Sequence, residues 1–177
     1  MNFGIIVLVL VFSALFNQSC TKQSANVDAI IYADKNFNFP PGLPPDPGEQ
    51  GKSTLLGVDS DHDGIRDDLQ RWIFARFPND PEKRAALGQT AKVFQESMTV
   101  ENGDKPLRAL LIRMSRAIDC LHDRFPEKLA ATNELDYLKA KALNTKMRTF
   151  RYLEVDKWMG GKSLGEEAAL DKGNHCE

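Results

Sequence analysis

The sequence predicts an all-α domain of about five helices, preceded by an acidic loop and a proline-rich segment. From Asp67 onward, apolar residues recur at the three- and four-residue spacing of amphipathic helices, and short turn signals separate these stretches. No stretch alternates apolar and polar residues as a half-buried strand does. We therefore expect a helical domain over residues 57–177, with short connections and mostly antiparallel neighbours.

The N-terminal end of the chain has the features of an export signal. Its first twenty residues are uncharged, and residues 3–16 form an apolar run, too short for a membrane span of roughly 20 apolar residues. Ser19 then stands directly before Cys20. This end resembles the signal of bacterial lipoproteins, which implies a signal peptide over residues 1–19, a lipid on Cys20 and a location on the periplasmic side of a bacterial membrane.

Two features depart from that pattern: no Lys or Arg precedes the apolar run, and Asn17 stands where an apolar residue is usual. Ordinary secretion and an uncleaved or mis-started N-terminus therefore stay open as alternatives. Residues 36–50 contain five prolines and two glycines, a composition that favours extended, semi-rigid chain. We expect residues 20–56 to be a tether, with a proline-rich ligand as the alternative.

The acidic loop begins at residue 59 and reads DSDHDGIRDD. Crowded carboxylates repel one another, so a cation among them is the expected compensation. Counted from Asp59, carboxylates occupy positions 1, 3, 5, 9 and 10, and Gly64 at position 6 permits a sharp turn. Oxygen-only ligands suit a hard cation, and Ca²⁺ fits such a loop better than Mg²⁺.

Residues 59–70, DSDHDGIRDDLQ, resemble the calcium loops of EF-hand, dockerin and thrombospondin type 3 proteins, which are built on Asp-x-Asp-x-Asp-Gly. Position 12 departs from the pattern, because Gln70 stands where a glutamate is expected. The alternative is an acidic, solvated turn that only caps the following helix. The ligands implied by the resemblance are Asp59, Asp61, Asp63, the Ile65 carbonyl and Asp67, completed by Asp68 or Gln70.

Four of the five expected helical stretches have a cap, a proline or a glycine at one of their ends. The five stretches are residues 67–77, 81–98, 104–123, 135–143 and 147–158. The apolar positions that we expect to line their inner faces are Leu69, Trp72, Ile73, Phe77, Ala86, Leu87, Thr90, Val93, Phe94, Met98, Leu107, Leu110, Leu111, Met114, Ile118, Leu121, Leu135, Leu138, Ala142, Leu143, Met147, Phe150, Leu153 and Trp158.

Three cysteines are present, and lipidation of Cys20 would leave Cys120 and Cys176 as a pair. An even pair in an oxidising compartment predicts a disulfide. Cys120 also lies off the apolar stripe predicted for residues 104–123. A cysteine that only fills the core would be expected on that stripe. Two unrelated free thiols are the alternative.

The sequence indicates no reaction. A net charge of −2 without a basic stripe argues against a nucleic-acid partner. Residues 57–159 also resemble bacterial envelope proteins of unknown function, which share the acidic opening and a later cysteine-bearing helix. We expect a non-enzymatic, calcium-binding envelope protein that contacts an unknown protein partner. One alternative is an inhibitor or immunity-type protein that neutralises a toxin or lytic enzyme. The other is a calcium-dependent hydrolase.

Overall fold

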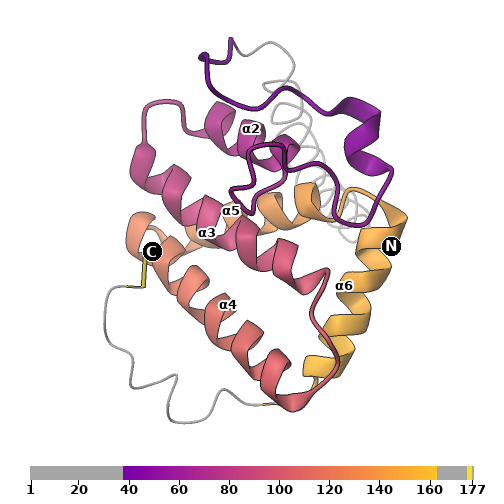
Figure 1. The fold of residues 1–177 in the computed structure, drawn as a ribbon. Coiled ribbons are helices and arrows are strands. Elements are labelled where there is room, and N and C mark those ends of the chain that lie inside the picture. The colour runs from indigo at the N-terminus through magenta and orange to yellow at the C-terminus, as the bar shows by residue number, and fades with distance from the viewer. Residues whose placement is uncertain (1–37, 163–174, 177) are drawn as a thin grey trace, which may run out of the picture. The chain divides into compact units, whose positions relative to one another are not determined.

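Five α-helices and one short 3-10 helix make up the part of the chain described by the computed structural model, residues 38–162 and 175–176 (Figure 1). The helices are η1 (Gly48–Lys52), α2 (Asp67–Arg76), α3 (Pro81–Ser97), α4 (Asp104–Arg124), α5 (Lys128–Ala142) and α6 (Lys146–Met159). These residues contain no strand, so the predicted all-α fold is confirmed for them. The expected signal peptide over residues 1–19 and the lipidated Cys20 lie outside the described residues.

Local sequence accounts for where the helices begin. Asp80 caps α3, because its carboxylate accepts a hydrogen bond from the Lys83 amide at 3.0 Å, and Pro81 occupies the first helical position. Thr145 caps α6 in the same way, accepting from the Arg148 amide at 3.2 Å. Both boundaries agree with the prediction from sequence.

Helix α3 packs most extensively against α4, and it also contacts α2 and α5. Figure 1 shows α3 and α4 running side by side. A core cluster forms where α3, α4 and α6 meet, from Val93, Leu107, Leu110, Ala117 and Val155. None of the helices in the described ranges has both the length and the apolarity needed to cross a membrane.

The buried face of α4 differs from the predicted one. Cys120 is 1% exposed and lies on the same buried face as Leu121 and Ala117, whereas Leu111 and Ile118 are only half-buried. The prediction that Cys120 lies off the apolar stripe was therefore wrong. The side chains of Ala117 and Cys120 are small, so neighbouring elements can pack closely against α4 at these positions. The buried face of α4 is therefore centred on these two residues.

The orientation of α6 also differs from the prediction. Met147, Phe150 and Leu153 were expected in the core, but each is more than two-fifths exposed. Arg148 and Val155 are buried in their place. The reason is polar: Arg148 must reach carbonyl groups beneath the helix, and this requirement sets which face of α6 turns inward.

The predicted tether is partly packed against the helices. Residues 39–56 belong to the same compact unit as the helical domain. The guanidinium of Arg71 lies 3.7 Å from the ring centroid of Phe39 and donates to the Pro44 carbonyl at 2.9 Å. Pro44 and Gly51 are buried. In the structure, this compact unit therefore begins at Phe39 and includes all five prolines of the proline-rich segment.

Candidate metal site

The acidic loop turns sharply before α2. His62 and Gly64 have φ angles of 58° and 86°, in the left-handed region, and His62 Nδ1 lies 2.9 Å from the Asp59 carbonyl oxygen. The Gly64 amide donates to Asp59 Oδ2 at 3.0 Å. The glycine predicted to permit the turn thus also supplies an N–H that orients the first carboxylate.

Three carboxylates converge inside this turn. Asp59, Asp61 and Asp67 each offer one oxygen, and these oxygens all lie within 4.8 Å of one another. Asp67 is the first residue of α2; its amide donates to the Val58 carbonyl at 2.9 Å, and its Oδ1 accepts from the Ser60 amide at 2.9 Å. Asp67 is therefore held against the backbone at the start of the loop, through both its amide and its carboxylate.

Several oxygens in this loop are buried without a hydrogen-bond donor. They are Asp59 Oδ1, Asp67 Oδ2 and Gln70 Oε1. The Asp67 residue is only 1% exposed. Leaving a buried carboxylate oxygen unpaired costs about 1–3 kcal/mol or more, since the ion has lost its hydration. A cation among these oxygens would remove that cost, so the cluster could hold a metal ion.

Gln70 and Asp63 lie at the edge of the cluster. The Gln70 Nε2 group donates to Asp61 Oδ2 at 3.0 Å and to Asp63 Oδ2 at 3.1 Å. Asp63 Oδ1 accepts from the Ile65 amide at 2.7 Å. The hydrogen bond from Gln70 lowers the pKa of Asp61, whereas desolvation raises the pKa of Asp63. The amide at loop position 12 therefore reaches the carboxylates at positions 3 and 5.

Asp68 is directed to a different partner. Its two carboxylate oxygens accept from Arg66 Nε at 2.8 Å and from Arg66 Nη2 at 2.9 Å, and Oδ2 also accepts from Asn144 at 3.2 Å. Arg66 is buried and donates further to the carbonyls of Lys141 and Ala142 at the end of α5. Of the two residues considered for completing the metal site, Gln70 is the one that contacts the other loop carboxylates.

A second buried arginine lies beside the loop, and sequence reasoning missed it. Arg148 donates to the carbonyls of Gly51, Thr54 and Leu55 and to the side chain of Asn144. Burial, helped by repulsion from the other buried arginine, lowers its pKa to about 10. Most of its partners are backbone groups, which leave no signature in a sequence.

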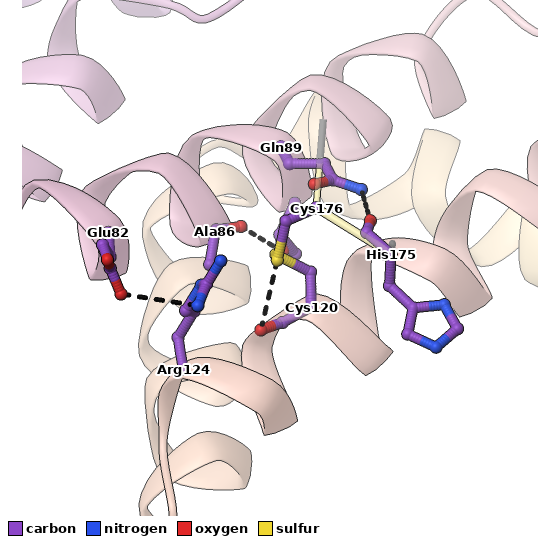
Figure 2. The surroundings of a disulfide bond; sticks show 8 residues. Glu82, Ala86, Gln89, Cys120, Arg124, His175 and Cys176 are labelled. Atoms are coloured by element: carbon purple, nitrogen blue, oxygen red, sulfur yellow. Dashed lines mark hydrogen bonds and ion pairs between the residues drawn. A yellow bond between two sulfur atoms is a disulfide. The ribbon is translucent and has the colours of Figure 1, made fainter. Parts of the chain in front are cut away.

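The predicted disulfide is present between Cys120 of α4 and Cys176 (Figure 2). Beside it, Gln89 of α3 donates to the backbone oxygen of His175 at 2.8 Å. The two residues described near the C-terminus are therefore attached to both α3 and α4.

No protein-family model, curated protein or solved structure matches this chain.

Proposed function

We propose that the protein binds Ca²⁺ in the bacterial cell envelope and has a structural or interaction role without catalysis. The observation that carries the proposal is the convergence of Asp59, Asp61 and Asp67 around buried oxygens that lack a donor. An acidic helix cap would explain Asp67, since a carboxylate is favourable at a helix N-terminus. It would not explain why an oxygen of Asp59 is buried and unpaired as well.

The chemistry of the donors favours Ca²⁺ over other metals. All groups available at the cluster are carboxylate, amide or carbonyl oxygens, which suit hard cations. Mg²⁺ needs near-ideal octahedral geometry and keeps several waters, whereas Ca²⁺ accepts six to eight oxygens in flexible arrangements. Asp59, Asp61, Asp67 and Gln70 would hold the ion, with Asp63 and the Ile65 carbonyl as further donors from the loop.

Bound Ca²⁺ would stabilise the start of the helical domain. Asp67 opens α2, and the neighbouring Asp68 links that end of α2 to Asn144 between α5 and α6. Neutralising the loop carboxylates removes the repulsion that loosens this junction. We expect Ca²⁺ to order the loop and α2 rather than to open a helix pair, since one loop and one following helix form the site.

Calorimetry on the chelator-treated full-length chain tests this proposal, with thermal melts in parallel. At 1 mM Ca²⁺ the stabilisation is about 2.7 kcal/mol for a Kd of about 10⁻⁵ M and about 1.4 kcal/mol for about 10⁻⁴ M. Asp59→Ala and Asp67→Asn should abolish the heat of binding. Asp136→Asn, an exposed change on α5, is the matched control and should leave it unchanged. Identical melting of the wild type with and without millimolar Ca²⁺ would refute the proposal.

An exposed apolar face on α6 supports the interaction role. Phe150 is 59% exposed and Leu153 is 53% exposed, and Met147 lies on the same side of the helix. Such a face suits a protein partner, which an inhibitor or immunity-type function would also require. Recovery of partners from envelope extract, with Ca²⁺ or with chelator, tests this role. Phe150→Ser should lose the partner and keep the melting temperature.

Membrane attachment through a lipid on Cys20 is the remaining part of the proposal. It is supported by the uncharged apolar run over residues 3–16 and by the Ser19–Cys20 pair that follows it. Mass spectrometry of the mature protein should find Cys20 at the N-terminus with acyl chains attached. A mature N-terminus elsewhere, without acyl mass, would exclude a lipid anchor.

A further inference from the structure

We propose that a hollow between α2 and α3 binds a small apolar carboxylate, with Lys92 as the partner of its charge. The hollow has a volume of about 500 Å³ and is lined largely by apolar side chains. It lies directly beside the acidic loop, because Ile65 and Gln70 line it as well. Only its coupling to Ca²⁺ rests on the function proposed above.

The shape of the hollow follows from the spacing of residues on α3. Arg84, Gly88 and Lys92 are four residues apart and share one face of that helix. Gly88 contributes no side chain to this wall, and a Cβ there would lie 3.2 Å from Ile65 Cδ1. Ile73 and Phe74 form the opposing wall on α2. This hollow, called the slot below, therefore has largely apolar walls and a cationic residue of α3 on either side of Gly88.

Charge decides which occupant suits the slot. Lys92 is exposed at the loop end, and no carboxylate lies within ion-pair distance of its ammonium among residues 38–162 and 175–176; Asp63 is a nearby negative charge. Arg84 at the other end donates to the carbonyls of Phe77 and Pro78, and Asp80 is a nearby negative charge for it. Apolar walls beside the Lys92 ammonium, which has no ion-pair partner in the described part of the chain, match an apolar body that carries one carboxylate.

Ca²⁺ and the carboxylate should assist each other. Without the ion, Lys92 is attracted to the loop carboxylates, and these repel an incoming anion. Bound Ca²⁺ would cancel both effects. We expect a coupling of about two- to fivefold, equal in both directions because linkage between two binding equilibria is reciprocal.

The test uses octanoate, with octanol as its uncharged match, titrated into the full-length chain in excess chelator by calorimetry and saturation-transfer NMR. Octanoate should bind, and each added methylene from butyrate upward should tighten binding by about three- to fourfold. Octanol should bind more weakly. Binding of octanol as tight as that of octanoate would mean an apolar occupant and overturn the role of Lys92.

Two variants locate the site, each with a control elsewhere on the surface. Lys92→Glu should weaken octanoate binding by roughly three- to tenfold, and Lys105→Glu should not. Ala85→Phe should fill the slot and reduce binding by more than tenfold, whereas Ala140→Phe on α5 should not. The melting temperature of each variant reports whether it folds.

The outcomes for the slot and for the metal site can be separated. If octanoate does not bind in the presence of chelator, the proposed carboxylate site is refuted. This conclusion does not depend on the heat of Ca²⁺ binding, which is measured separately without octanoate. Octanoate binding that Ala85→Phe leaves unchanged overturns the proposed site equally, because the ligand would then lie elsewhere. Octanoate binding that is lost with Ala85→Phe and strengthened by Ca²⁺ supports the slot and its coupling to the loop.

Discussion

Gly57, two residues before the acidic loop, lies against the two buried arginines. Its φ angle is 74°, and a Cβ at this position would lie 2.6 Å from Arg66 Cδ and 2.7 Å from Arg148 Nη2. Neither arginine can move aside, because hydrogen bonds to Asp68 and to several carbonyls fix both guanidinium groups. The position requires glycine for its conformation and for its lack of a side chain.

We therefore expect Gly57→Ala to lower the free energy of unfolding by about 2–4 kcal/mol, from left-handed backbone strain and a steric clash. Gly42→Ala is the control, because its φ of 101° is also one that L residues rarely adopt, while nothing lies within 4 Å of a Cβ there. Urea denaturation measures the loss of unfolding free energy in each variant, and the difference between the two losses gives the steric contribution at Gly57. Equal losses would show that the arginines do not confine Gly57.

Gln70 is the residue that departs from the calcium-loop pattern, and it gives a second test. Gln70→Glu replaces a neutral amide, which donates to Asp61 and Asp63, by a charged group that repels them. We expect the chain in chelator to melt at a lower temperature and Ca²⁺ to bind about tenfold more tightly, since ligand charge tunes affinity in such loops. Gln50→Glu, an exposed change in η1, should alter neither quantity. Unchanged Ca²⁺ affinity would place Gln70 outside the metal site.

At this scale the sequence could predict the acidic cluster but not what surrounds it. Spacing along the chain marks Asp59, Asp61 and Gly64, because a short loop brings them together whatever the rest of the fold does. Arg66 and Arg148 could not be foreseen, since their partners are mostly carbonyls distant in sequence.

Helix α6 illustrates what decides the orientation of a helix. Its apolar residues occur on more than one side, so hydrophobic periodicity alone does not select the inward face. The buried guanidinium of Arg148 does select it, because an arginine taken out of water must keep its hydrogen-bond acceptors. Val155 is fully buried as a consequence, and Leu153 is left 53% exposed.

This orientation can be tested by truncating one side chain on each face. Val155→Ala should lower the free energy of unfolding by about 1–3 kcal/mol, because it leaves a cavity in the core cluster. Leu153→Ala should change it by less than about 0.5 kcal/mol. Chemical denaturation of the two variants measures both values. The reverse order would mean that Leu153, and not Val155, lies on the inward face of α6.

The same reasoning explains why α4 was only partly predictable. Its bounds follow from a glycine before it and a proline after it, and both are visible in the sequence. The centre of its buried face depends on where small residues such as Ala117 allow close packing, and that depends on the neighbouring helices. Element positions are therefore set locally, whereas the rotation of each helix about its axis is set by tertiary contacts.

At the scale of the molecule, the helical fold could be predicted because the spacing of apolar residues recurs along most of the chain. The boundary of the folded unit is less predictable. Residues 39–56 look like a tether by composition, yet Arg71 and Arg148 hold their carbonyls against the helices. A proline-rich segment has rigid backbone, so ordering it on a surface costs less entropy than ordering a flexible one.

The Cys120–Cys176 bond has its effect at the level of the whole chain. It links α4 to a residue 56 positions later, and so restricts the unfolded chain over almost a third of its length. Removing a cross-link over a loop of this size should cost about 2–4 kcal/mol, mainly by restoring entropy to the unfolded state. We therefore expect Cys120→Ala with Cys176→Ala to lower the urea midpoint markedly.

The bond should matter little to the metal site, because the loop carboxylates are held by Ser60, Gly64 and Gln70 rather than by the C-terminal end. The double variant should therefore keep the Ca²⁺-dependent rise in melting temperature of the wild type, starting from a lower value. Thermal melts with Ca²⁺ and with chelator measure both quantities on one sample. If the rise disappeared with the bond, the C-terminal attachment would be part of what forms the site, and the loop could not be treated as a locally determined unit.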